Sequence, residues 1–272
     1  MAVEILDGAM GTELLARGLE LRGSEWSARA IHEAPDLIAE IHSDYARAGA
    51  TVHTANTFRT QPRALGPGWK KAAEAAVRIA RGAVPAEHRV LGSMAPVEDC
   101  YRPDLSSGEG ARQEHAAVAE ALAGAGCDVL LCETFAHPIE ARVASEEAMR
   151  TGLPVWLSLT GGPFGALLRP AELAAIAAAA AATGVERVLV NCVSASMTQG
   201  YLEALAGLDV ALGVYANAGR EDEGLGWSAS DTKAASAYAD VAVGWVDAGA
   251  TLVGGCCGTG PLHIEALARR FG

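Results

Sequence analysis

Three cysteines have the residue type and spacing for a metal site. Cys256 and Cys257 are adjacent in the segment GGCCG at 254–258, and Cys192 lies in VNCV at 190–193. Adjacent side chains on a strand normally point to opposite faces, but flanking glycines permit backbone angles that could turn both sulfurs toward one point. Three sulfurs suit zinc, which is tetrahedral, and leave its fourth position for water or substrate. The alternative is that these cysteines are small buried hydrophobic residues.

Polar side chains follow other apolar runs. Asp7 lies at the end of a candidate strand, Glu133 comes directly after one, and the pair Asn56 and Thr57 and Asn217 follow within three residues. If the strands form a barrel, these residues and the cysteines gather at the carboxyl ends of the strands, where such barrels have their active sites. Asp7 could instead cap a helix over 12–17 or form an Asx turn, and Glu133 could be a surface-loop carboxylate. Asn56 and Asn217 either bind a substrate or tie their own loops.

The elements that must position these residues alternate between strand and helix patterns. Apolar runs typical of buried parallel strands occupy 4–7, 51–54, 89–92, 128–132, 155–159, 187–191, 210–215 and 251–254. Segments with helical periodicity, many of them Ala-rich, occupy 35–48, 71–81, 111–125, 138–150, 170–182, 197–205, 231–248 and 261–270. This alternation predicts an α/β fold, a single (β/α)8 TIM barrel with 1–272 as one domain. The long polar connection 95–110 predicts an active-site loop, with an ordinary mobile insertion as the alternative.

The composition argues against several classes of protein. The 272 residues include 33 acidic and 21 basic side chains, a net charge of −12, with no clustered basic face, which argues against nucleic acid as a partner. No window of about 18 residues is uninterrupted and apolar, so we expect no membrane segment. Six cysteines without a secretory leader indicate free thiols and a cytoplasmic protein. Cys127 and Cys132 are expected in the core, Cys100 has no assignment, and no histidine is given a catalytic role.

The ordered motifs resemble those of the homocysteine S-methyltransferase family. They are DGAMGT at 7–12, NTF at 56–58, ETF at 133–135, VNC at 190–192 and GGCCGT at 254–259. Each motif alone is weak, whereas the ordered combination, from about residue 4 to residue 265, is specific. The resemblance implies a (β/α)8 barrel whose Zn²⁺ is held by Cys192, Cys256 and Cys257, with homocysteine as the methyl acceptor.

The resemblance also implies which residues contact the substrate. The loop of Asp7 and the side chain of Glu133 would hold the amino acid part of homocysteine. Glu133 would pair with the ammonium group, and backbone amides from Gly8 to Met10 would hold the carboxylate. A thiol coordinated to zinc is deprotonated, so it can attack the methyl group of a small sulfonium or ammonium donor without a separate base. S-Methylmethionine or S-adenosylmethionine is the donor that the resemblance favours.

Two other functions stay open at this point. A zinc-holding barrel could bind homocysteine as a subunit or sensor without turnover. A barrel enzyme acting on a phosphorylated metabolite could hold phosphate at the turn GTGP at 258–261, although glycine-rich turns alone are weak evidence. No lysine lies at a predicted strand end, which counts against a Schiff-base aldolase. The sequence gives no indication of the oligomeric state.

Overall fold

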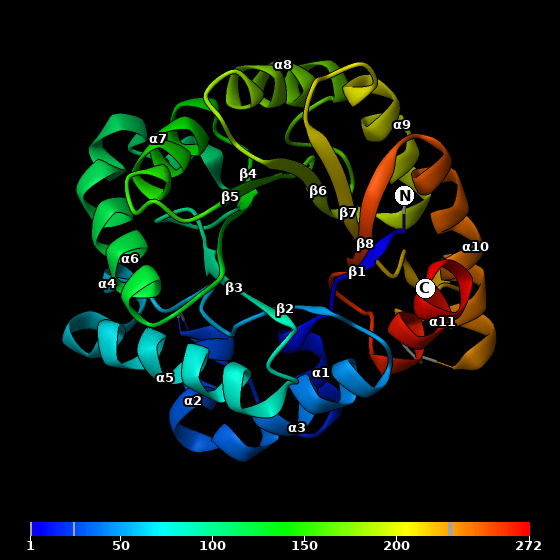
Figure 1. Cartoon of the computed structure of the whole chain (residues 1–272), viewed down its shortest axis with the longest axis horizontal. Coiled ribbons are helices and arrows are strands. Elements are labelled where there is room, and N and C mark those ends of the chain that lie inside the picture. The colour runs from blue at the N-terminus through cyan, green and yellow to red at the C-terminus, as the bar shows by residue number, and fades with distance from the viewer. Residues whose placement is uncertain (1, 24, 228–230) are drawn as a thin grey trace.

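Eight parallel strands form a ring with the helices outside it (Figure 1). The structure, a computed structural model, describes residues 2–23, 25–227 and 231–272. The strands are neighbours in the order β1-β8-β7-β6-β5-β4-β3-β2, and a parallel bridge between Leu6 and Val52 joins β1 to β2. The predicted (β/α)8 barrel is confirmed. The strands are β1 (Glu4–Ile5), β2 (Val52–Thr54), β3 (Arg89–Met94), β4 (Val129–Phe135), β5 (Val155–Leu159), β6 (Arg187–Ser194), β7 (Ala211–Asn217) and β8 (Ala250–Gly255).

Helices connect the strands on the outside of the ring. They are α1 (Met10–Ala16), α2 (Ala30–Glu33), α3 (Pro35–Arg47), α4 (Pro62–Leu65), α5 (Trp69–Ala83), α6 (Arg112–Gly124), α7 (Pro138–Met149), α8 (Pro170–Ala181), α9 (Ala195–Leu205), α10 (Thr232–Asp247) and α11 (Pro261–Phe271). Short 3-10 turns lie at η1 (Trp26–Arg29), η2 (Gly66–Gly68), η3 (Pro103–Leu105), η4 (Gly108–Ala111) and η5 (Glu221–Glu223). Several helices begin with proline, whose missing N–H costs nothing in the first turn. Within the described ranges, no helix is long and apolar enough to cross a membrane.

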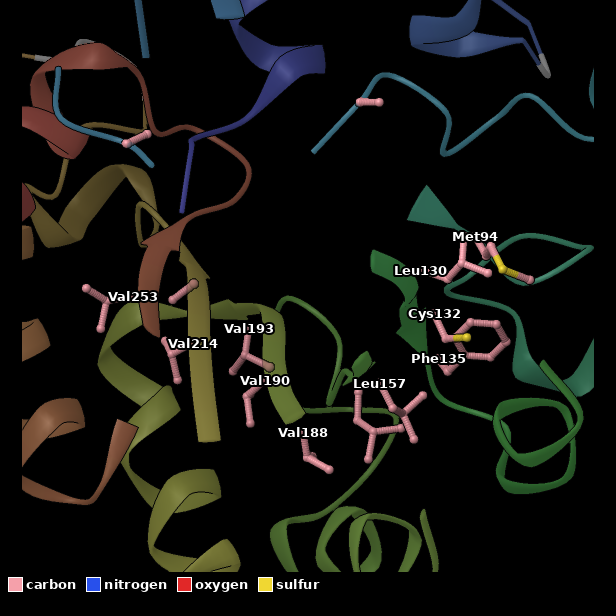
Figure 2. Packing of buried hydrophobic residues seen from close by; sticks show 14 of the residues in the cluster. Met94, Leu130, Cys132, Phe135, Leu157, Val188, Val190, Val193, Val214 and Val253 are labelled. Carbon is pink, nitrogen blue, oxygen red and sulfur yellow. The ribbon is translucent and has the colours of Figure 1, made fainter. Parts of the chain in front are cut away.

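Two apolar layers pack against the strands. The barrel interior contains Leu6, Val52, Leu91, Val129, Leu131, Trp156, Leu189, Tyr215 and Leu252. Other residues of the strands pack toward the helices, and Figure 2 shows part of this outer layer, including Val188 and Val190 of β6. Because both faces of each strand are covered, the strands read as nearly continuous apolar runs.

Charged residues close the amino end of the barrel interior over an aromatic ring. The Arg187 guanidinium donates to Glu4 at 2.6 Å, and Arg89 pairs with the same carboxylate. The guanidinium carbons of Arg89 and Arg187 lie 5.1 and 4.6 Å from a ring centre of Trp156. Each of these residues lies at or near the start of its strand. The polar residues predicted for the site lie at the opposite, carboxyl end.

Several strands extend further than the sequence pattern predicts. The strands β4, β6 and β7 continue to Phe135, Ser194 and Asn217. Glu133, Cys192 and Asn217 therefore lie inside the last residues of their strands rather than after them, which corrects the expected strand ends. The carboxyl ends of β4 and β6 each contain a shift in register. Hydrophobic patterns do not reveal such bulges, because the extra residue changes the local pairing and not the composition.

Candidate metal and substrate site

The three cysteines that the sequence singles out lie together. Their sulfurs lie within 4.8 Å of one another, and the sulfurs of Cys192 and Cys256 are 2.8 Å apart. Cys192 has φ of 52°, a left-handed conformation that non-glycine residues rarely adopt. A Cβ atom at Gly255 would lie 2.2 Å from the Thr259 hydroxyl, so only glycine allows the chain to turn this closely before Cys256. Backbone strain is thus concentrated where the sulfurs converge.

An asparagine orients Cys192. The side-chain amide of Asn191 donates to the Thr134 hydroxyl at 2.7 Å and to the Cys192 sulfur at 3.4 Å. The Ser158 hydroxyl donates to the Asn191 carbonyl oxygen at 2.8 Å. Thr134, with φ of 65°, lies in the register shift of β4, as Cys192 lies in that of β6. Sequence reasoning missed Asn191 as a functional residue; its signal is a polar side chain inside an apolar strand, directly before a candidate ligand.

The chemistry of the donor set fits a thiophilic metal ion. Hydrogen bonds from Cys192 and Cys256 lower the pKa of the Cys257 thiol well below its usual value. Hydrogen bonds with Cys192 and Cys257, together with burial, raise the pKa of Cys256. The cluster therefore favours one thiolate, and a second would be repelled by it unless a cation lies between them. Three protein sulfurs with one open position are the ligand set of a catalytic zinc site.

The sulfurs line a cavity of about 640 Å³ at the carboxyl end of the barrel. Asp7, Glu133 and the three cysteines all contribute to its wall. The connection after β3 contributes Val97 to Tyr101, as expected for an active-site loop, and it places Cys100 in the wall as well. The volume lies within the range that binds small molecules.

Two carboxylates share this cavity. Asp7 accepts a hydrogen bond from the backbone N–H of Thr54 at 2.9 Å, and Glu133 accepts one from the Ser93 hydroxyl at 2.5 Å. Burial raises the pKa of Asp7 well above its usual value, and the negative charge of Glu133 adds to this effect. Burial also raises the pKa of Glu133, against the hydrogen bond from Ser93. Asp7 is not the cap of the following helix, because that position belongs to Ala9.

The remaining predicted site residues differ in their positions. Gly8 and Met10 line the cavity, and a Cβ atom at Gly8 would lie 2.7 Å from the Tyr45 ring. Asn56 lines the cavity and also ties its loop by donating to the Ser27 carbonyl at 2.8 Å. Thr57 is not among the residues that line the cavity; its hydroxyl bonds the backbone of Ser93. Asn217 is likewise buried outside the cavity wall.

Other cysteines and histidines complete the comparison with the sequence. Cys127 and Cys132 are buried in the outer apolar layer, as expected. His137 caps α7 by accepting from the backbone N–H of Glu140. His42, to which the sequence pattern assigned no role, is fully buried in α3 beside Asp7. The signal that could have revealed it is its place on the apolar face of α3, between Ile38 and Tyr45.

The family model for homocysteine S-methyltransferase matches residues 4–271. The chain belongs to this family. The homocysteine S-methyltransferase of Escherichia coli strain K12 is 35% identical over 98% of this chain and 94% of that protein. Homocysteine S-methyltransferase 4 of Zea mays is 30% identical over 97% of this chain and 88% of that protein.

A solved structure shares the fold over nearly the whole chain. It is the crystal structure of the homocysteine methyltransferase MmuM from Escherichia coli in its metallated form, with a TM-score of 0.83 and 31% identity. The match covers 99% of this chain and 96% of that one. The homocysteine S-methyltransferase family membership therefore rests on sequence and on structure together.

Proposed function

We propose that the protein transfers a methyl group from a small sulfonium donor to the sulfur of homocysteine, giving methionine. The observation that carries the proposal is the convergence of Cys192, Cys256 and Cys257 on one wall of a cavity that the carboxylates of Asp7 and Glu133 also line. Family membership supports homocysteine as the acceptor. The donor and the metal are the parts that the proposal adds.

Cys192, Cys256 and Cys257 would hold Zn²⁺ and leave one position open. The chemistry that bound zinc supplies is a lowered pKa for the substrate thiol, which makes it a nucleophile at neutral pH. The chain itself fixes the direction of the sulfurs through the bulge at Cys192 and the hydrogen bonds of Asn191. Because the ligands are held before the substrate arrives, little reorganisation is needed during the reaction.

Asp7 and Glu133 would hold the ammonium group of homocysteine between them. Asp7 is buried and Glu133 is partly buried; the two carboxylates repel each other and have few hydrogen bonds within the chain, so a cation at this point is stabilised by both. The backbone from Gly8 to Met10 lines the adjacent wall and would take the substrate carboxylate. These contacts set the position of the thiol relative to the cysteines, and alignment of nucleophile and donor supplies a large part of the rate.

The donor would occupy the part of the cavity lined by aromatic and acidic side chains. Trp26, Phe58 and Tyr101 contribute rings, and Glu98 and Asp99 contribute carboxylates. A cation is attracted to the face of an aromatic ring, and the Arg59 guanidinium already lies 5.3 Å from the centre of Phe58. A sulfonium carries the same charge and loses it as the methyl group leaves. Arg59 and Arg63 line the same part of the cavity, and Arg63 pairs with Glu98, so the aromatic rings and Asp99 are the groups that would attract a cationic donor.

The test combines metal content with donor screening. Protein purified under reducing conditions should contain about one zinc per chain. The Cys192→Ser, Cys256→Ser and Cys257→Ser variants should lose the metal, and Cys127→Ser, in the core, should keep it. The zinc-loaded protein is then incubated with homocysteine and S-methylmethionine, S-adenosylmethionine or glycine betaine, and methionine is measured. We expect methionine from a sulfonium donor only.

Two results would contradict the proposal. Protein that takes up no zinc would exclude the thiolate chemistry. Protein that binds zinc and homocysteine but makes no methionine from any donor would be a binding barrel and not a transferase.

A further inference from the structure

Three histidines lie in a row that leads away from Asp7, and we call this row the file. His42 of α3, His53 of β2 and His88, just before β3, come from separate elements. His53 Nε2 lies 3.0 Å from His88 Nδ1, and the two rings are within 10° of coplanar. His42 and His53 are fully buried, whereas His88 is partly exposed. The file therefore connects the cavity carboxylate with solvent.

The file runs between the barrel wall and α3. Val52 points into the barrel interior, so its neighbour His53 on β2 points outward toward the helices, since successive side chains alternate along a strand. Asp7 follows β1, lines the cavity and faces His42 of α3. His88 precedes β3 and so lies at the amino ends of the strands, while Asp7 follows β1 at the carboxyl ends. The exit of the file is thus on the opposite side of the barrel from the cavity.

The spacing between Asp7, His42 and His53 suits a bridging water. Asp7 Oδ2 is 4.0 Å from His42 Nδ1, which is too long for a direct hydrogen bond, and no distance among one oxygen of Asp7 and one nitrogen of each of His42 and His53 exceeds 4.8 Å. Ligands of a zinc-like ion at 2.0–2.1 Å would be only about 3.4 Å apart. Groups that share a water at about 2.8 Å from each are separated by about 4.6 Å. A buried water commonly has three such partners.

The ring nitrogens of His42 need a hydrogen-bond partner such as a water. Neither has a hydrogen-bond partner among the residues that the structure describes, although the ring is completely buried. Buried polar groups are bonded in nearly all proteins, and an exception requires an explanation. A water bonded to Asp7, to one nitrogen of His42 and to Nδ1 of His53, which also has no such partner among the described residues, joins Asp7 to the file.

We propose that His42, His53 and His88 form a proton path through which Asp7 loses its proton when the ammonium group of the substrate binds. The proposal rests on the proposed function for the position of that ammonium group. The carboxylic acid O–H bond of Asp7 breaks, its electron pair stays on the carboxylate, and the proton passes to the bridging water and then along the rings to solvent. The ammonium group of the substrate covers Asp7 on the cavity side, so the histidines offer the other way out for the proton.

The charges around the file favour outward movement. Burial raises the pKa of Asp7, and Glu133 of β4 adds to this, so the empty site favours the neutral acid. Burial lowers the pKa of His42 to about 4 and that of His53 to about 3, so both rings rest neutral and can relay a proton without trapping it. Arg81 of α5 donates to the carbonyl of His88 at 2.9 Å and disfavours a proton resting on His53.

The test follows proton release on binding of L-methionine, which carries no thiol proton, to the metal-free protein. Calorimetry in buffers of different ionisation enthalpy should give release of up to about one proton in the wild type and none in Asp7→Asn. Stopped-flow with a pH indicator should show that His88→Ala releases the proton about ten-fold more slowly, and that added imidazole restores the rate. His32→Ala, an exposed histidine on α2, is the matched control and should match the wild type.

A second variant tests the interior of the file. His53→Phe should slow release without rescue by imidazole, because the buried position admits no added base. Wild-type release rates in His88→Ala would overturn the path, as would binding with no proton released. Absence of methionine and homocysteine binding would instead overturn the proposed function, and the path with it.

Discussion

Two buried carboxylates of this barrel, each beside a histidine, have opposite environments. Glu140 of α7 accepts from the backbone N–H of Val97 at 2.8 Å, from the Ser106 hydroxyl, and contacts His115 Nε2 at 3.1 Å. Asp7 accepts one hydrogen bond, from Thr54, and its histidine is 4.0 Å away. Burial works to raise the pKa of both groups. The hydrogen bonds outweigh burial at Glu140 and lower its pKa, whereas Asp7 stays raised.

This difference indicates that Glu140 has a structural role and that Asp7 is available to bind a ligand. Glu140 is satisfied within the chain and fastens the connection after β3, whose other residues line the cavity. Asp7 lines the same cavity with little support of its own. An ionised group is kept in a protein interior only if something pairs with it. The groups that pair with Glu140 belong to the chain itself. For Asp7 we propose that the pairing group is the ammonium group of the substrate.

The largest effect expected from this comparison is on activity. Asp7→Asn removes a charge from the ammonium site, and kcat/KM for homocysteine should fall about 100-fold, equivalent to about 2.7 kcal/mol. The melting temperature should stay the same or rise, because Asp7 is buried and its ionised form has little compensation in the free protein. Steady-state kinetics and calorimetric melting measure the two effects. An Asp7→Asn variant that keeps its activity but is less stable than the wild type would contradict the binding role proposed for Asp7.

The next effect is on stability. Glu140→Gln weakens hydrogen bonds to a charged acceptor, and the free energy of unfolding should decrease by about 2 kcal/mol. The dissociation constant for homocysteine, measured by calorimetry, should change by less than about three-fold, since Glu140 lies outside the proposed ammonium site. Urea unfolding gives the stability. Equal stability of the variant and the wild type would contradict the structural role.

The pH dependence of stability should differ in sign for the two groups. Glu140 has a pKa below its usual 4.5, so its contribution is present above that value and is lost as the pH falls through the lowered pKa. Asp7 has a pKa above its usual 3.8, so its contribution is present below that value and is lost as the pH rises through the raised pKa. Urea unfolding from about pH 2.5 to pH 8 should show the stability of Glu140→Gln approaching that of the wild type below about pH 4.5. The free energy of unfolding of Asp7→Asn should increase relative to that of the wild type as the pH rises.

The smallest effect comes from one hydrogen bond. Ser106→Ala removes one of the donors to Glu140 and should cost about 1 kcal/mol of unfolding free energy. Combined with Glu140→Gln, it should cost little more than Glu140→Gln alone, because both changes act on the same bond. Strict additivity of the two losses would show that Ser106 stabilises the connection in another way.

The sequence was sufficient to predict the barrel and to single out the three cysteines. Alternating apolar runs and helical segments determine the number and order of the strands. The glycines that flank Cys256 and Cys257 can be read directly from the sequence. The bulges at Thr134 and Cys192 were not predictable, because their positive φ angles arise from pairing between neighbouring strands. Asn191 and His42 were missed for a related reason: their partners come from distant parts of the chain.

The join between β1 and β2 has a kinetic consequence. It depends on a single bridge, Leu6 to Val52, with backbone bonds from Thr51 to Ile5 and from Asp7 to Val52. The side chain of Asp7 supplies a further bond across the join, to the N–H of Thr54. A short join of this kind opens locally more often than the longer ladders elsewhere in the ring. Amide hydrogen exchange at Thr54 therefore reports how often the ring opens, and a ligand that fixes Asp7 should slow it.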